Sequence, residues 1–150
     1  MFMVNIKLGV IDDLETIERI VNEAYGVYLD RLGKKPAPML DDYPDLIQKQ
    51  YVHVIEEGNQ IYGILVLVPM EKHMLVENVA VHPDFQGHGY GRMLLDYADE
   101  TAKMRGYSEI RLYTHEKMIE NQEIYRHLGW KEYMRQTEDG YNRVYMKKTL

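Results

Sequence analysis

Seven consecutive residues in the second half of the chain, Gln86-Gly87-His88-Gly89-Tyr90-Gly91-Arg92, carry its clearest chemical signal. The apolar run at 75–81 before them is typical of a strand, and residues 93–98 after them have the pattern of a helix. Glycines let the backbone approach a ligand closely, and the first N–H groups of a helix have no acceptor within that helix. The helix dipole adds partial positive charge at the same end. The stretch therefore predicts a loop that binds a pyrophosphate.

Two common phosphate-binding loops do not fit this stretch. A P-loop requires Lys followed by Ser or Thr after its second glycine, whereas Gly91 is followed by Arg92-Met93. A dinucleotide-binding fingerprint requires Gly-x-Gly-x-x-Gly near the first strand of a parallel sheet. Here the glycines at 87, 89 and 91 have a different spacing and lie past the middle of the chain. The pattern that remains is Gln86-x-x-Gly89-x-Gly91.

This pattern resembles the coenzyme A loop of the GNAT superfamily of N-acetyltransferases, which reads Arg or Gln, two residues, Gly, one residue, then Gly or Ala. Residues 79–86 resemble the strand that leads into that loop. Ile124-Tyr125-Arg126-His127-Leu128-Gly129-Trp130 resembles the family's later helix-to-strand motif, which usually ends in Gly-Phe. The two motifs occur in the family's order, and the resemblance covers roughly residue 61 to the C-terminus.

The resemblance implies acetyl-CoA as cosubstrate and assigns two groups of residues to it. Backbone N–H groups of the loop would hold the pyrophosphate, with Gln86 shaping the turn and charge added by the last of these residues: Gly87, His88, Gly89, Tyr90, Gly91 and Arg92. The strand residues Val79, Ala80 and Val81 would bind pantetheine through their backbone, and the Val79 N–H would donate to the acetyl carbonyl. Taken alone, Val-Ala-Val indicates only a buried strand.

One position departs from the family pattern. Many members carry an asparagine seven residues before the tyrosine of the later motif, where it contacts the coenzyme. Here that position is Met118. Asn121 lies four residues before Tyr125 and therefore shares its helical face. Asn121 is the candidate replacement.

Glu77 is the candidate general base for an incoming amine. Strand periodicity predicts that it shares a face with Val79 and Val81, while Asn78 faces the other way as a structural residue. Members of the family often carry a carboxylate four residues before the position of Val81. A carboxylate beside a buried cleft is expected to have a raised pKa, which suits a base. The alternative is a solvated or ion-paired glutamate, with Glu116 and His115 as the next candidates.

Tyr125 is the candidate general acid. The resemblance implies that its hydroxyl lies near the coenzyme sulfur, and a phenol with a pKa near 10 can protonate a departing thiolate. The alternative interpretation is a tyrosine packed in the core. No metal is expected, because the six histidines are scattered and no His-Glu-x-x-His motif occurs.

The elements that must position these residues can be read from periodicity and turn signals. The pattern predicts strands at 4–10, 51–57, 61–68, 73–81, 109–114, 130–135 and 141–147. It predicts helices after a cap at Asp12 or Asp13, at 42–50, at 90–105 and at 120–128. Asp139-Gly140 predicts the turn of the last hairpin. This order indicates an α+β fold with a mixed sheet.

The family resemblance implies the same fold in more detail: a mostly antiparallel central sheet, helices on both faces, and a pair of strands that splay apart to admit the pantetheine arm. At 150 residues, the chain is expected to form one domain over 1–150. The acceptor wall is expected between the first helices, at Tyr25, Tyr28, Arg31, residues 34–39 and residues 41–43. Asp41, Asp42 and Asp45 would either attract an ammonium group or supply helix-capping charge.

Composition excludes several classes of function. With no cysteine, the chain has neither a disulfide, nor a thiolate metal site, nor a cysteine nucleophile. A net charge of −6 argues against general nucleic-acid binding and is compatible with cationic substrates or with simple solubility. Residues 1–7 lack the apolar run of a signal peptide, and no apolar stretch approaches the ~20 residues of a membrane span. A cytoplasmic location is therefore expected.

The sequence is thus interpreted as an acetyl-CoA-dependent N-acetyltransferase that acetylates a primary amine directly, on a small molecule or on a peptide or protein. A longer-chain acyl-CoA transferase, a non-catalytic CoA-binding regulatory module and a structural subunit are the alternatives. The identity of the amine and the pairing of two copies into a homodimer are left open.

Overall fold

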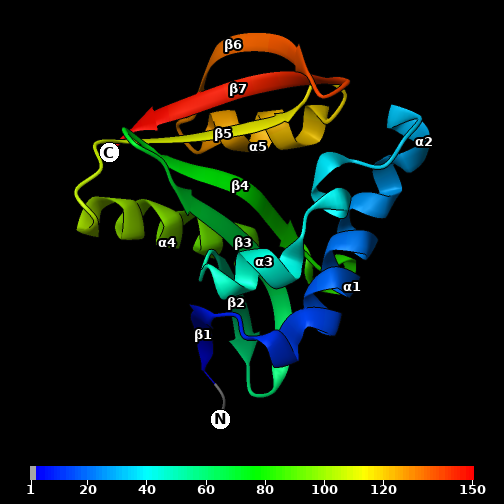
Figure 1. The fold of residues 1–150 in the computed structure, drawn as a ribbon, viewed down its shortest axis with the longest axis vertical. Helices are drawn as coiled ribbons and strands as arrows, with labels where there is room; N and C mark the ends of the chain where they lie inside the picture. Colours follow the sequence, from blue (N-terminus) through cyan, green and yellow to red (C-terminus); the bar gives the residue numbers. More distant parts are fainter. Residues whose placement is uncertain (1–2) are drawn as a thin grey trace.

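A computed structural model describes residues 3–150; Met1 and Phe2, part of the N-terminal stretch considered above, lie outside the described residues. Its centre is a seven-stranded sheet with strand order β1-β2-β3-β4-β5-β7-β6 (Figure 1). The strands are β1 (Val4–Leu8), β2 (Val52–Glu57), β3 (Gln60–Pro69), β4 (Met74–Val81), β5 (Glu109–His115), β6 (Lys131–Glu138) and β7 (Tyr141–Thr149). Neighbouring strands pair antiparallel except β4 and β5, which pair parallel. The predicted α+β class with a mostly antiparallel sheet is confirmed.

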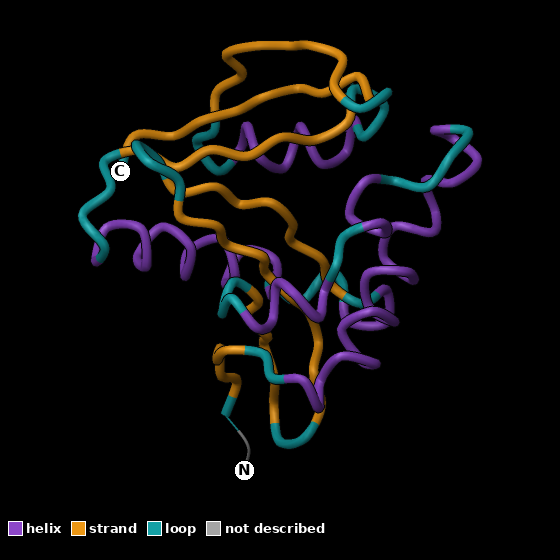
Figure 2. The backbone as a smooth tube through the Cα atoms, viewed as in Figure 1, coloured by secondary structure: helices purple, strands orange, loops and turns teal. Residues whose placement is uncertain are grey.

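Helices cover both faces of this sheet (Figure 2). The α-helices are α1 (Leu14–Tyr25), α2 (Leu29–Leu32), α3 (Tyr43–Gln48), α4 (Tyr90–Met104) and α5 (Ile119–His127). Short 3-10 turns are η1 (Ile11–Asp13), η2 (Gly26–Tyr28), η3 (Ala37–Leu40) and η4 (Pro83–Phe85). The predicted helices and strands are present, whereas α2, η2 and η3 between the first two predicted helices were not anticipated. The described residues contain no helix with the length and apolarity needed to cross a membrane.

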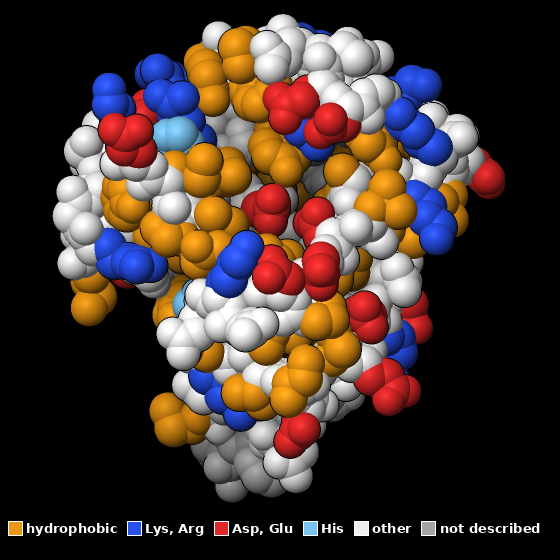
Figure 3. Space-filling model, in the orientation of Figure 1, with side chains coloured by type: hydrophobic (Ala, Val, Ile, Leu, Met, Phe, Trp, Pro, Cys, Tyr) orange, Lys and Arg blue, Asp and Glu red, His pale blue; other side chains and the backbone are white. Residues whose placement is uncertain are grey.

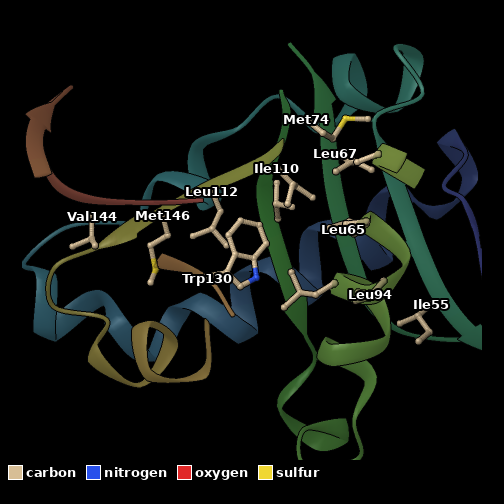
Figure 4. Packing of buried hydrophobic residues seen from close by; sticks show 14 of the residues in the cluster. Ile55, Leu65, Leu67, Met74, Leu94, Ile110, Leu112, Trp130, Val144 and Met146 are labelled. Atoms are coloured by element: carbon tan, nitrogen blue, oxygen red, sulfur yellow. The ribbon is translucent and has the colours of Figure 1, made fainter. Parts of the chain in front are cut away.

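Two hydrophobic clusters hold the layers together. One fills the α4 and α5 side of the sheet, where Leu94 of α4 packs with Leu65 and with the buried Trp130 that follows α5 (Figure 4). The other lies on the opposite side, where α1 contributes apolar side chains at helical spacing, including Ile17 and Val21. The central strands are therefore buried on both faces, which explains their nearly continuous apolar sequence.

The start of α1 differs from the prediction. Asp13 is the residue before α1, but its side chain makes no capping hydrogen bond to this helix. Because η1 leads directly into α1, Asp13 already has helical backbone angles, and its carboxylate instead accepts the N–H of Val10 at 3.0 Å. Asp13 thus stabilises the preceding 3-10 turn, and the predicted cap of α1 by Asp12 or Asp13 was wrong.

The parallel pair β4–β5 separates midway along its length. Residues 74–76 of β4 pair with 110–112 of β5, but no pairing continues through the remaining residues of β4 up to Val81. Over this second half, β4 stays paired with β3 and β5 stays paired with β7. The sheet therefore opens between β4 and β5, which confirms the expected splayed strand pair.

A β-bulge at Glu77 changes the faces of β4. Opposite β3, Asn78 pairs with Val66 and Val76 pairs with Leu67, so Glu77 is the extra residue. Val76 packs in the α4-side cluster, whereas Asn78 bonds to tyrosines of the α1-side cluster. The prediction that Glu77 shares a face with Val79 and Val81, opposite Asn78, was wrong, because strict alternation does not continue through a bulge.

Close packing beside this strand makes Gly63 of β3 sensitive to substitution. A Cβ at Gly63 would lie 2.7 Å from the Ala80 carbonyl oxygen, so Gly63→Ala must push two paired strands apart. We expect the free energy of unfolding to fall by about 1–3 kcal/mol, measured by urea denaturation. Gly26→Ala is the matched control, because its Cβ would meet no atom within 4 Å. Equal stabilities of the two variants would contradict the prediction.

Candidate active site

A groove with a volume of about 780 Å³ opens where β4 separates from β5 and α4 begins. It is lined by β4, by the loop before α4, and by side chains of α1 and α5. Of the eleven residues predicted to bind the coenzyme, ten line it: Val79, Ala80, Val81, Gln86, Gly87, Gly89, Tyr90, Gly91, Arg92 and Asn121. His88 does not line it, and its ring instead stacks against Tyr90 at 5.9 Å between centroids.

The glycine-rich loop has the geometry of an anion-binding site. Gly87 and Gly89 both have φ of +84°, a conformation that favours glycine, and Gly89 is the N-cap of α4. The first hydrogen bond of the helix runs from the Met93 N–H to the Gly89 carbonyl at 3.0 Å. The N–H groups of residues 90–92 come before it and have no acceptor within the helix. Together with the dipole of a 15-residue helix, they provide a site for phosphate oxygens.

The backbone of β4 presents donors to the same groove. The His82 N–H donates to the Tyr62 carbonyl of β3 at 2.9 Å, so alternation directs the polar groups of Val81 and Val79 away from β3. Side-chain donors occupy both carbonyls: Gln86 Nε2 donates to Val81 at 3.1 Å, and the Tyr25 hydroxyl donates to Val79 at 3.1 Å. The Gln86 contact links the start of the loop to the end of β4, as the predicted turn-shaping role would require. Since a strand residue directs its N–H and carbonyl to one side, the Val79 and Val81 N–H groups also face the opening.

A second, smaller cavity of about 50 Å³ lies against the same opening. Its wall shares four residues with the groove: Tyr25, Val79, Asn121 and Tyr125. Glu77 lines this smaller cavity and does not line the groove. The two spaces are therefore neighbours with a common wall, and the Val79 backbone and the Tyr125 side chain lie at the boundary between them.

Glu77 lies among charged groups of the smaller cavity. Burial raises the pKa of Glu77, while Arg143 and Lys49 oppose that rise. Burial and the neighbouring Glu77 raise the pKa of Asp41 to about 7, again opposed by Arg143. The Asp41 carboxyl is therefore protonated in part of the population near neutral pH, because burial and the Glu77 charge disfavour its ionised form. Acidic side chains also gather near the middle of the face shown in Figure 3, which suits a cationic ligand.

Tyr125 lies on α5 with its ring edge-on to Trp130, at 6.3 Å between centroids. Burial raises its pKa above that of an ordinary tyrosine, so the hydroxyl keeps its proton throughout the neutral range. The residue lines both cavities. A neutral, proton-bearing hydroxyl at this boundary is able to donate a hydrogen bond or a proton.

A buried hydrogen-bond chain that the sequence analysis missed supports the common wall. Asn78 is 3% exposed; its Oδ1 accepts the Tyr25 hydroxyl at 2.6 Å, and its Nδ2 donates to the Tyr43 hydroxyl at 3.0 Å. The Tyr43 hydroxyl in turn donates to the Pro38 carbonyl at 2.5 Å. An asparagine in a strand that is apolar apart from Glu77 was the available signal, because a buried amide requires partners.

The other candidates fall in different places. His115 lines the smaller cavity, but its Nδ1 already accepts the Lys117 N–H at 3.0 Å, and burial lowers its pKa. Glu116 lines neither cavity and accepts a hydrogen bond from Asn142 at 3.1 Å. Asn121 lines both cavities. His115 is therefore the stronger of the two reserve bases.

The aspartates between the first helices separate into two roles. Asp42 caps α3, because its side chain accepts the Asp45 N–H at 3.1 Å, and Asp45 pairs with Lys49 at 2.8 Å. The capping interpretation therefore holds for these two, whereas Asp41 interacts with Glu77. Within residues 3–150, no three His, Asp or Glu side chains are grouped so that they could hold a metal ion.

Comparison with protein families gives one match to this chain. The model described as acetyltransferase (GNAT) domain matches residues 48–132, which include β4, the glycine-rich loop, α4 and α5. This match covers more than half of the chain and contains most of the residues that line the groove; the others lie between residues 24 and 31. No curated protein matches the sequence significantly.

Solved structures share the fold over nearly the whole chain. The ribosomal-protein-S18-alanine N-acetyltransferase from Escherichia coli is 18% identical with a TM-score of 0.78, covering 98% of this chain and 94% of its own. A PaiA N-acetyltransferase from Thermoplasma acidophilum in complex with coenzyme A is 18% identical with a TM-score of 0.74, covering 99% of both chains. A structure from Elizabethkingia anophelis with acetyl-CoA bound is 17% identical with a TM-score of 0.70, covering 98% of both.

Proposed function

The chain belongs to the GNAT family of acetyltransferases, and we propose that it moves an acetyl group from acetyl-CoA directly to the nitrogen of a primary amine. The observation that carries this proposal is the common wall of the two cavities. An N–H-rich groove that fits a pyrophosphate and its pantetheine arm meets, at Val79 and Tyr125, a small cavity whose wall includes the Glu77 carboxylate. Two structurally similar proteins with coenzyme A or acetyl-CoA bound support the choice of cosubstrate.

The residues present fit acetyl-CoA at each end of the groove. Gly87, Gly89 and the N–H groups of residues 90–92 would hold the pyrophosphate, and Arg92 would add positive charge. The N–H groups of Val79 and Val81, which face the opening, would bind the pantetheine arm. When bound, acetyl-CoA supplies the acetyl carbonyl carbon and the thiolate leaving group.

Three groups of this chain would then serve the transfer. The Glu77 carboxylate accepts the proton that the amine must lose, directly or through water, because only a neutral amine is nucleophilic. The Val79 N–H donates to the carbonyl oxygen as negative charge develops on it. The Tyr125 hydroxyl gives its proton to the departing sulfur. A direct transfer requires no nucleophile from the protein, in agreement with a cysteine-free chain.

The size of the smaller cavity favours an acetyl group over a longer acyl chain. A volume of about 50 Å³ has room for roughly four water-sized groups. An acetyl group and the reacting part of an amine would fill that space. The boundary position of Tyr125 likewise supports turnover over a purely regulatory coenzyme-binding role.

A thiol-release screen with acetyl-CoA and a panel of primary amines tests this function. Because the chain contains no cysteine, a thiol reagent reports only the coenzyme A that is released. We expect release that depends on both acetyl-CoA and an amine, with N-acetylated product identified by mass spectrometry. Tight acetyl-CoA binding with no release for any amine would contradict the proposal in favour of a regulatory module.

Glu77→Gln is expected to lower kcat/KM at neutral pH by roughly 10²-fold, because it preserves shape and removes the base. In the wild type the carboxylate must be ionised, so the rate should rise with pH through a pKa raised above the usual glutamate value. The variant should lose the rise in rate that is due to ionisation of the carboxylate. Its rate should instead recover at high pH, where more of the amine is neutral. The measurement is a pH–rate profile with saturating acetyl-CoA.

Glu123→Gln is the control for this profile, because Glu123 is exposed on α5 and lines neither cavity. Coenzyme affinity should be unchanged in both variants, since the proposed coenzyme contacts are mostly backbone. If the Glu77→Gln profile overlays the wild type, Glu77 is not the base. His115→Gln would then be the next variant to measure.

A further inference from the structure

The segment between the first helices lines one side of the smaller cavity. We call residues 31–40, which run from the last residues of α2 to the end of η3, the strap (Figure 1). Four strap residues line the cavity: Leu32, Pro36, Ala37 and Pro38. The strap therefore forms a wall of the space in which the amine would react.

Two basic side chains of the strap bind it to α5 and to the β6–β7 hairpin. Arg31 pairs with Glu120 of α5 at 2.7 Å and donates to the Lys117 carbonyl at 3.1 Å. Lys34 donates to the Gly140 carbonyl in the β6–β7 turn, and its ammonium lies 3.9 Å from the centre of the Tyr141 ring.

Two tyrosines hold the middle of the strap through its backbone. The Tyr141 hydroxyl of β7 donates to the Lys35 carbonyl at 2.6 Å. The buried Tyr43 hydroxyl donates to the Pro38 carbonyl, and it also accepts from Asn78 of β4. The strap is thereby tied to α5, to the β6–β7 hairpin and, through Tyr43, to the strand that carries Glu77.

This arrangement leaves few backbone groups for a peptide. Pro36 and Pro38 have no N–H to donate. The carbonyls of Lys35 and Pro38 accept from tyrosines, and that of Pro36 accepts the Met39 N–H at 3.0 Å. An extended peptide is recognised mainly by main-chain hydrogen bonds, so this wall offers it little. A peptide backbone that entered here would lose its hydrogen bonds to water without forming equivalent hydrogen bonds to the strap.

From this wall we propose that the acceptor is a compact primary amine with a short apolar or aromatic body, and not the end of a protein chain. The small volume limits how much of the acceptor can be enclosed, Leu32 and the prolines of the strap would contact the part of its body next to the amine, and Glu77 would attract its ammonium group. The proposal rests on the N-acetyltransferase function proposed above. It adds that the strap and its ties to the β6–β7 hairpin set the selectivity.

Primary amines of increasing size test this directly, and phenylalanine amide and the tripeptide amide form the pair with the same N-terminal residue. We would measure kcat/KM with acetyl-CoA for n-butylamine, phenethylamine, phenylalanine amide and the amide of the tripeptide Phe-Ala-Ala. The expected order places phenethylamine or n-butylamine at least 10-fold above the tripeptide, with the difference mainly in KM. A tripeptide used as well as the small amines would overturn the inference while leaving the N-acetyltransferase function intact.

The role of the strap is tested by releasing it from the hairpin. The double variant Lys34→Ala, Tyr141→Phe removes both hydrogen bonds between the strap and β6–β7. We expect the ratio of small-amine to tripeptide kcat/KM to fall at least 5-fold. Lys131→Ala, Tyr133→Phe is the matched control, because both residues lie on the same hairpin and line neither cavity.

The outcomes separate the two proposals. A lowered ratio in the strap variant, with an unchanged ratio in the control, supports the inference. A ratio that stays at the wild-type value in a folded strap variant overturns the role of the strap. Bound acetyl-CoA without transfer to any amine, small or peptidic, overturns the N-acetyltransferase function itself. Thermal unfolding of both variants identifies any loss of activity that is due to loss of fold.

Discussion

Gly89→Asp is expected to weaken acetyl-CoA binding by roughly 10²–10³-fold while the chain remains folded. Gly89 is the N-cap of α4, so the carboxylate would lie where the pyrophosphate is expected to bind. Two like charges about 4 Å apart repel by about 4 kcal/mol near a protein surface, which salt and water reduce. A Cβ at this position meets no atom within 4 Å, so the packing of the loop is not disturbed. Isothermal titration calorimetry with acetyl-CoA measures the change.

Gly89→Asn separates charge from backbone strain, because asparagine has nearly the same shape and the same cost at φ of +84°. We expect its affinity to lie much closer to the wild type than that of the aspartate variant. Gly106→Asp adds a second control at another glycine with positive φ and open surroundings, just beyond the other end of α4. Unchanged acetyl-CoA affinity in Gly89→Asp would show that the loop is not the pyrophosphate site.

The loop could be predicted from the sequence because its causes are local. One short stretch contains the end of a strand, three alternate glycines and the first residues of a helix. Together they determine the conformation of the loop and leave its N–H groups free. The turn at Asp139-Gly140 is equally local: both residues have positive φ, as the predicted hairpin requires. The splay of β4 from β5 depends on the whole sheet, and only the family resemblance implied it.

The face of Glu77 could not be predicted because it depends on pairing with a distant segment. The bulge arises from the register of β4 against β3, and no residue within β4 signals it. As a result Glu77 lines the smaller cavity, near Asp41, and not the larger groove. The bulge places a carboxylate on the acceptor side while Val79, two residues later, still presents its N–H to the opening. The deviation from strand periodicity is thus what separates the proposed base from the coenzyme contacts.

The acceptor wall was expected at Arg31 and residues 34–39, which belong to the strap, but the contacts that hold the strap were missed for a related reason. Those contacts come from Tyr43, Tyr141 and Glu120, which are distant along the chain or belong to other elements. Thirteen tyrosines in 150 residues gave no indication of which hydroxyls would bond to backbone carbonyls. Sequence patterns predict local conformation, whereas these hydrogen bonds and the ion pair depend on which distant segments the fold brings together.

Tyr125→Phe is the second large effect we expect: turnover should fall by roughly 10²-fold while acetyl-CoA affinity changes little. The ring keeps its edge-on packing against Trp130, and only the proton at the boundary between the cavities is lost. Because burial raises the pKa of this hydroxyl, the wild type should show no alkaline decline from Tyr125 below about pH 10. Steady-state kcat across pH, together with coenzyme titration, measures both parts.

Tyr25 is the rival proton donor, because it lines the same common wall, and its variant decides between the two. Its hydroxyl is already directed to Asn78 Oδ1 and the Val79 carbonyl, so Tyr25→Phe should lower stability through a buried amide left without its donor. A Tyr25→Phe variant that keeps turnover near the wild type, beside a slow Tyr125→Phe variant, identifies Tyr125 as the acid. The reverse result assigns the acid to Tyr25. Near-wild-type rates in both would mean that the thiolate leaves unassisted or takes its proton from water.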